Sequence, residues 1–299
     1  MSVTLLWYFL KRSPKFIIII LNFITIFLTF FLLTGCYNEQ NKNTFLVKYQ
    51  FNKHSSFFPI IKQSYDNTNS NKTQGLENIV IRSGYMGICI DNIPNNYNLH
   101  NQPLKSTCYP RKNISDVSFY NDLMIKISSV NSQNSSVSTD KTNLNILKLA
   151  QITSVNIIHP YILGATIILS LIHFLLLFYL MIPHVPLKKY INKPMFLLSL
   201  IMTLLWGIGA TWTHIAVHSA FDFIPEASMN IIKVKKGKKA ALMSWFSFSF
   251  LLLISCILFA NEWKNSQDSE NENAHESDKE NIYNYHYYSS DGSSFGTKV

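Results

Sequence analysis

The stretch Gly84-Tyr85-Met86-Gly87-Ile88-Cys89 lies within a long polar segment and is followed, after eighteen residues, by Cys108. Apolar residues alternate with polar ones before it, which predicts a strand. Its two glycines indicate a turn or a close approach of another backbone. A Cys89–Cys108 bridge would close a loop of about twenty residues and add about 3 kcal/mol of stability. Such bridges persist in oxidising compartments, so we expect a bridged hairpin outside the cell.

Apolar runs flank this segment and give the chain of 299 residues a positive mean hydropathy. Each run is close to the roughly 20 residues that an α-helix needs to cross a bilayer. Because a backbone in lipid must satisfy its own polar groups, the runs predict helices and leave the strands to the connections. We therefore expect a four-helix transmembrane bundle with an extracellular antiparallel β-sheet. The expected spans are 16–35, 161–182, 195–216 and 240–260.

Lys and Arg residues before the first span, between the second and third spans and after the fourth favour a cytoplasmic N-terminus, although five lysines from Lys233 to Lys239 contradict that rule. The sequons at Asn71, Asn113 and Asn134 and the cysteine pair require the exterior, and they decide the orientation. Both termini are then cytoplasmic. The expected regions are a cytoplasmic N-terminus at 1–15, a glycosylated extracellular β domain at 36–160, a cytoplasmic turn at 183–194, a second extracellular loop at 217–239 and a disordered acidic cytoplasmic tail at 261–299.

The expected outer domain begins after a first span that ends in Gly35-Cys36, which is similar to a bacterial lipoprotein cleavage site. The run is longer than a signal peptide needs, so we expect an uncleaved anchor, with Cys36 either free or bridged to another cysteine. Alternation predicts strands at 45–51, within 78–90 and at 123–127. A weaker helical pattern covers 143–150.

The net charge of +9 is divided unevenly by this topology. The two outer connections carry 17 Lys and Arg against 9 Asp and Glu, whereas the tail from Asn261 carries 3 Lys against 8 acids. A basic outer surface suits anionic wall polymers or lipid headgroups, or serves only solubility. We expect no nucleic-acid partner.

Polar residues at the outer end of the third span recur every fourth position, at His214, His218, Asp222 and Glu226. This is a spacing that metal ligands use, but calcium would accept only the two carboxylates. The alternative is ordinary polar side chains at the headgroup level. His173, inside the second span, is either a functional group or a histidine hydrogen-bonded to another helix. The sequence contains no enzyme motif, and we expect no catalysis.

The motif residues Gly84, Tyr85, Met86, Gly87, Cys89 and Cys108, with four spans and one large outer loop, resemble the claudin-like superfamily. They are similar above all to the fungal pheromone-induced family of calcium regulators and membrane-fusion proteins. Tyr85 departs from the pattern, which has an apolar residue there. The glycines either serve turn chemistry alone or let the hairpin sit close to the sheet or to a neighbouring subunit.

The resemblance implies a plasma-membrane glycoprotein, concentrated at the mating projection, that promotes low-affinity calcium influx and cell fusion as a regulatory or adhesive subunit. It implies no cofactor, with calcium as a transported or bound ion. The expected partners are the lipid bilayer, a second copy of the chain, a calcium channel subunit or a surface protein of the mating partner. The alternative is a structural organiser of membrane domains, similar to the fungal eisosome four-span proteins.

Overall fold

The computed structural model describes residues 3–67, 73–97, 106–111, 114, 117, 119–128, 141–182 and 188–290. Within these ranges, four helices are long and apolar enough to cross a membrane. They are α1 (Val3–Leu33), α4 (Pro160–Met181), α5 (Lys188–Ala227) and α6 (Lys238–Ser290). Exposed Ile, Leu and Phe side chains cover their outward faces, as a surface in contact with lipid requires. The expected four-helix bundle is confirmed.

The bundle is a closed ring, in which α1 and α5 each contact both α4 and α6. Hydrogen bonds cross its interior: Thr203 Oγ1 lies 2.8 Å from Ser255 Oγ. Asn22 Nδ2 lies 3.1 Å from His173 Nδ1 and donates to the carbonyl of Ser170. His173 therefore has a hydrogen-bond partner on another helix, which was one of the two roles expected for it. A polar group buried among apolar helices needs such a partner from a neighbouring helix.

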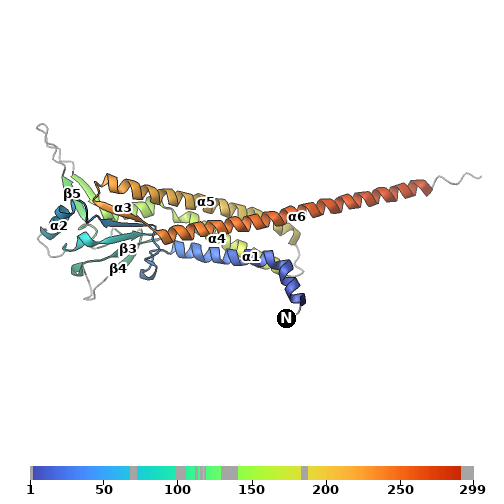
Figure 1. Ribbon diagram of the computed structural model, residues 1–299, viewed down its shortest axis with the longest axis horizontal. Coiled ribbons are helices and arrows are strands. Elements are labelled where there is room, and N and C mark those ends of the chain that lie inside the picture. The colour runs from blue at the N-terminus through green and yellow to red at the C-terminus, as the bar shows by residue number, and fades with distance from the viewer. Residues whose placement is uncertain are drawn as a thin grey trace, which may run out of the picture.

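An antiparallel sheet lies at one end of the bundle, and the N-terminus lies at the other (Figure 1). In the described part of the chain the sheet has five strands in the order β4-β3-β2-β1-β7, and β5 and β6 form a separate pair. The strands are β1 (Val47–Phe51), β2 (Val80–Ser83), β3 (Gly87–Asp91), β4 (Ser106–Pro110), β5 (Met124–Ser128), β6 (Lys141–Asn145) and β7 (Ile232–Lys236). The expected alternation in the first strand is confirmed, because Val47, Tyr49 and Phe51 are buried.

Short helices surround the sheet. Helix α2 (Phe58–Asn67) was not predicted, and α3 (Ile146–Ile152) packs on β2. The helical pattern expected from residue 143 begins only at α3, because the side chain of Asn145 caps the backbone N–H groups of Leu147 and Lys148. Shorter turns occur at Glu39–Asn41, Leu76–Asn78, Asn95–Tyr97 and, as a π-helix, Thr153–Ile157.

The segment 217–239, expected as a loop, contains regular secondary structure, and this corrects the expectation. Helix α5 continues beyond the third span to Ala227, and β7 then joins the sheet beside β1. The strand alternates buried Ile232 and Val234 with exposed Lys233 and Lys235. The lysines suit an edge strand, because charged side chains there prevent pairing with other chains.

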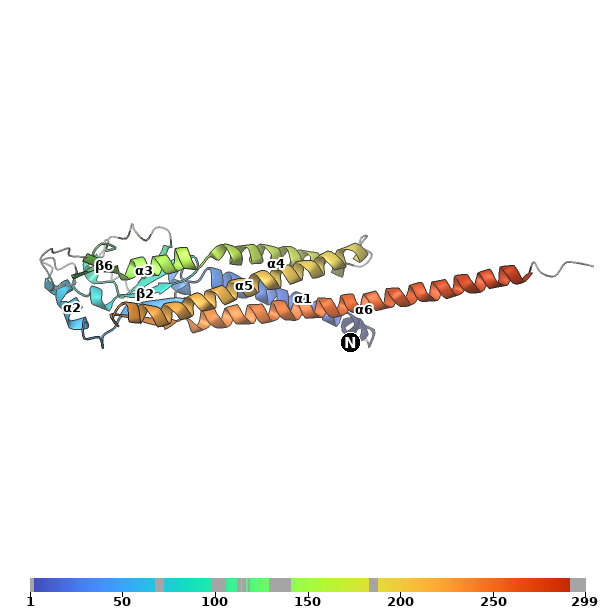
Figure 2. The ribbon, with the colours of Figure 1, turned by 90° about the horizontal axis from the view of Figure 1, so that it is seen from above.

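The expected disordered tail is also corrected, since α6 continues as a helix to Ser290 and runs alone past the bundle (Figure 2). No Gly or Pro occurs between Gly237 and Gly292. A helix already formed in the membrane can extend through such a sequence, because propagation costs far less than nucleation. In the same way, α1 begins at Val3 inside the expected N-terminal region, and α5 begins at Lys188 inside the expected turn.

Candidate functional site

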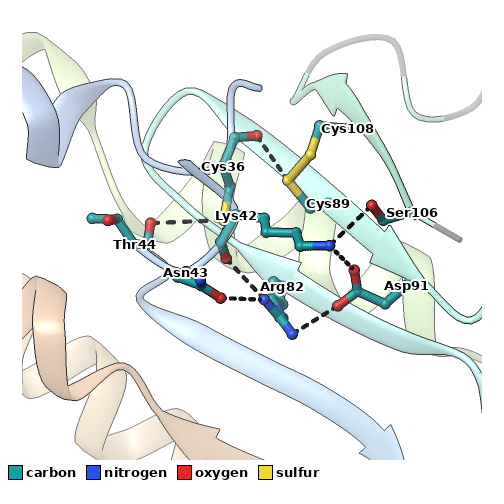
Figure 3. The surroundings of a disulfide bond; sticks show 9 residues. All are labelled: Cys36, Lys42, Asn43, Thr44, Arg82, Cys89, Asp91, Ser106 and Cys108. Carbon is teal, nitrogen blue, oxygen red and sulfur yellow. Dashed lines mark hydrogen bonds and ion pairs between the residues drawn. A yellow bond between two sulfur atoms is a disulfide. The ribbon is translucent and has the colours of Figure 1, made fainter. Parts of the chain in front are cut away.

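The motif forms the turn between β2 and β3. These strands pair antiparallel, and the backbone N–H of Gly84 donates to the carbonyl of Gly87 at 2.9 Å, which closes the turn. Strand β4 follows on the other side of β3, with Cys108 directly opposite Cys89. These two cysteines form a disulfide, so the expected bridge is confirmed (Figure 3).

The glycines of the turn admit a second backbone. A Cβ atom added to Gly84 would collide with the carbonyl oxygen of Gly35, and one added to Gly87 would collide with that of Cys36. Gly87 would in addition place its Cβ 3.0 Å from Tyr37 Cα. The segment 35–37, directly after α1, therefore lies backbone against backbone on the hairpin. We call this contact the α1–hairpin joint. The glycines therefore permit a close approach, as the functional version of the glycine hypothesis expected, but the element approached is the segment after α1, and that hypothesis named the sheet or a neighbouring subunit.

Cys36 lies at the centre of the joint. It is free and fully buried, with φ of 59°, and its carbonyl oxygen lies 3.4 Å from Cys89 Sγ. Burial raises the pKa of the Cys36 thiol from 9.0 to about 12. A buried, protonated thiol is a poor nucleophile, so Cys36 serves packing and not thiol chemistry.

Charged side chains tie the segment after the joint to the sheet. Arg82 on β2 pairs with Asp91 on β3 at 2.9 Å and donates to the carbonyl of Lys42 at 3.2 Å and to Asn43 Oδ1 at 3.0 Å (Figure 3). Lys42 reaches the other oxygen of Asp91 at 3.7 Å and donates to Ser106 Oγ on β4. The carboxylate is thus neutralised by two cations and is not available to bind a calcium ion.

Tyr85 connects the turn to the bundle. Its ring is buried, and its hydroxyl donates to Thr213 Oγ1 on α5 at 3.0 Å. Ser154 Oγ donates to the carbonyl of Gly84 at 2.9 Å. The tyrosine therefore replaces the apolar residue of the family pattern at a site where its ring can be buried and its hydroxyl satisfied. Met86, the next residue, is 39% exposed.

The proposed metal set is not brought together. The rings of His214 and His218 lie 4.4 Å apart, but Lys236 Nζ lies 2.8 Å from His218 Nδ1. Helical rise separates His214 from Glu226 by about 18 Å, too far to share one ion with Asp222 between them. Among the described residues, no three His, Cys, Asp or Glu side chains are close enough to hold a metal. The four-residue metal hypothesis is wrong for this part of the chain.

The sequons stay predictions, because Asn71, Asn113 and Asn134 lie outside the described residues. Two interactions at the site were not predicted from the sequence: the Arg82–Asp91 ion pair and the hydrogen bond from Tyr85 to Thr213. Arg82 lies within a predicted strand stretch and Asp91 directly after it, but only the hairpin register, which pairs Arg82 with Cys89 and Asp91 with Val80, makes them diagonal neighbours that can form an ion pair. Gly35-Cys36 was noted as a span end, and no local pattern connects it with the hairpin.

A four-helix bundle with a disulfide-bridged sheet at one end, joined to the first span at a Gly-x-x-Gly-x-Cys turn, defines the class as a multi-pass membrane protein with a β-sheet domain. Comparison with known families narrows this class. Residues 65–262 match the family described as Ca2+ regulator and membrane fusion protein Fig1. The chain is also 48% identical to the Factor-induced gene 1 protein of Saccharomyces cerevisiae over 301 residues, which covers 100% of this chain and 99% of that protein. The chain belongs to this family of calcium regulators and membrane-fusion proteins.

Proposed function

We propose that the chain promotes low-affinity calcium influx and cell fusion during mating, as a non-enzymatic glycoprotein of the plasma membrane. In this proposal the sheet faces outward, both termini are cytoplasmic and the protein gathers at the mating projection. Membership of a family described by calcium regulation and membrane fusion supports the calcium and fusion roles. The calcium ion is the ion that enters, and not a resident cofactor.

The observation that carries the mechanism is the α1–hairpin joint. Backbone atoms meet there without intervening side chains, so a displacement of the sheet moves the outer end of α1 directly. Tyr85 and Ser154 connect the same turn to α5 and to the segment before α4. An event at the outer domain, such as contact with a partner cell's surface protein, would thereby bias the bundle and any channel subunit packed against it.

A regulatory or adhesive subunit fits this chain better than a pore. The expected spans contain no Asp or Glu, whereas cation channels commonly use rings of acidic side chains for selection. The ions would therefore pass through a partner whose gating this protein controls.

The test is calcium uptake in pheromone-treated cells that lack the endogenous protein and carry either the wild-type chain or a variant. Gly87→Val should abolish both uptake and fusion, because its side chain has no room beside Cys36. Surface biotinylation confirms export. The double substitution Asp222→Asn with Glu226→Gln is the control and should leave uptake unchanged.

Two outcomes would contradict the proposal. Normal uptake and fusion in an exported Gly87→Val protein would remove the joint from the mechanism. Uptake that is independent of the chain, together with stable cortical patches in growing cells, would favour the organiser of membrane domains instead.

A further inference from the structure

An open apolar groove of about 680 Å³ lies beside the joint, on the outward side of α1 and α4. Its walls come from the end of α1, the motif turn, the end of β4 and the first turns of α4. The residues that line it include Leu33, Met86, Arg111, Tyr161, Gly164 and Ile168. Its position places it where the sheet meets the apolar spans.

Arg111 is the one cation among the described residues that line the groove, and it is only 7% exposed. One guanidinium nitrogen donates to the carbonyls of Ser154, at 2.9 Å, and Ile158, at 3.4 Å. The guanidinium carbon lies 5.9 Å from the centre of the Tyr161 ring. The described residues supply no carboxylate in contact with it. A buried cation to which the described residues offer only neutral groups favours an additional anion as its partner.

Gly164 is not explained by packing within the chain. A Cβ atom added to it would meet none of the described atoms within 4 Å, whereas one added to Gly207 would lie 3.0 Å from Phe248 and one added to Gly209 would lie 3.1 Å from Ile162. Glycine inside a helix is less favourable than alanine. The open space at Gly164 is therefore room for atoms of another molecule.

The depth of these features matches a lipid. Arg111 contacts the first turn of α4, where the apolar span begins, and Ile168 lies about 10 Å further along the helix. Tyr161, 69% exposed, and Tyr37, 49% exposed, also line the groove, and aromatic residues of membrane proteins are enriched at the level of the headgroups. The groove thus presents a positive charge at headgroup level and an apolar surface below it.

We propose that this groove binds a membrane phospholipid, with its phosphate at Arg111 and an acyl chain against Leu33, Gly164 and Ile168. A second copy of the chain fits less well, because its spans contain no acidic side chain to neutralise the arginine. The bound lipid would also touch Met86, which places it against the motif turn. The inference does not rest on the proposed function, and its test measures lipid binding alone.

The test uses the full-length protein in phosphatidylcholine vesicles that contain a trace of phosphatidylcholine with a photoreactive diazirine on one acyl chain. Peptide mapping should find label on Leu33 and on the first turns of α4. Gly164→Leu places a side chain in the groove, starting from a position where an added Cβ meets none of the described atoms within 4 Å, and should reduce that label severalfold. Arg111→Gln should reduce it about tenfold, the loss expected for one charge-assisted hydrogen bond. A diacylglycerol probe with the same diazirine should label the wild-type groove as weakly as phosphatidylcholine labels Arg111→Gln.

Thr211→Leu, at an exposed position in the middle of α5, is the matched control and should label as the wild type does. If Arg111→Gln does not fold, Gly164→Leu and the diacylglycerol probe decide the outcome. Label in Gly164→Leu at the wild-type level, or equal label from diacylglycerol, would overturn the proposal. Cross-linking of two chains through the groove, or displacement of the probe by inorganic phosphate, would assign the groove to self-association or to a soluble anion instead.

Discussion

Gly87 allows the α1–hairpin joint to form because it has no Cβ atom. Gly87 is the first residue of β3 and does not have a positive φ angle, so its backbone conformation does not require glycine. The constraint is space, because the Cys36 carbonyl occupies the volume that a side chain would fill. A motif glycine of this kind specifies a contact between two chain segments, which a turn glycine does not.

Gly87→Ala should therefore destabilise the folded protein by about 1–3 kcal/mol, the usual cost of overpacking. Gly164→Ala is the matched control, since its methyl group enters open space and alanine favours the helix. The measurement is the thermal unfolding midpoint of the two proteins in detergent. Equal midpoints for Gly87→Ala and the wild type would show that the joint yields to a methyl group.

At the scale of elements, two segments adopt regular structure that composition did not reveal. Strand β7 could have been found, because Ile-Lys-Val-Lys alternates as a half-buried edge strand does. The tail could not, since its polar residues show no apolar period and a polar helix depends on the helix it extends.

Truncation after Gln267, beyond the apolar part of α6 that ends at Lys264, should leave the thermal midpoint and export unchanged, because the distal part of α6 runs past the bundle (Figure 2). The far-ultraviolet circular dichroism per molecule should fall at the same time, since a helix as far as Ser290 is removed. A lower midpoint would show that the distal helix stabilises the bundle. Unchanged dichroism would show that the tail contributes no helix in solution.

At the scale of the whole molecule, the outer domain buries acidic groups in their neutral forms. Burial raises the pKa of Tyr49 and Tyr85 from 10.0 to about 12, and that of Cys36 from 9.0 to about 12. The hydroxyls keep hydrogen-bond partners, Thr153 for Tyr49 and Thr213 for Tyr85. The folded state therefore holds these protons at a pH where the unfolded chain releases them.

These raised pKa values make the folded protein less stable at alkaline pH. Above about pH 9 the folded state binds more protons than the unfolded state, so the free energy of unfolding falls as the pH rises towards 12. The slope vanishes well below pH 9, where both states keep these protons. Thermal midpoints measured across this range should fall on the alkaline side, and Tyr85→Phe should make the fall shallower. An identical alkaline slope in Tyr85→Phe would exclude this phenol as a contributor.

The sequence by itself determined the spans, the hairpin and its bridged cysteines, because these features rest on local signals. Hydropathy over about 20 residues specifies a membrane helix, and alternation over a few residues specifies a half-buried strand. Cys89 and Cys108 lie within one loop, so their pairing needs no knowledge of distant segments.

Only the tertiary structure decided what the hairpin touches. Gly35 meets Gly84, Tyr85 meets Thr213, and Arg111 meets the start of α4, across separations that no local pattern records. The metal hypothesis failed for the same reason. His214 and Glu226 share one face of a helix but lie too far apart along it to bind the same ion. His218 is contacted by Lys236 on β7, a strand whose pairing with β1 was not predicted. Local preferences fix each element, but the contacts between elements depend on how their surfaces pack in space.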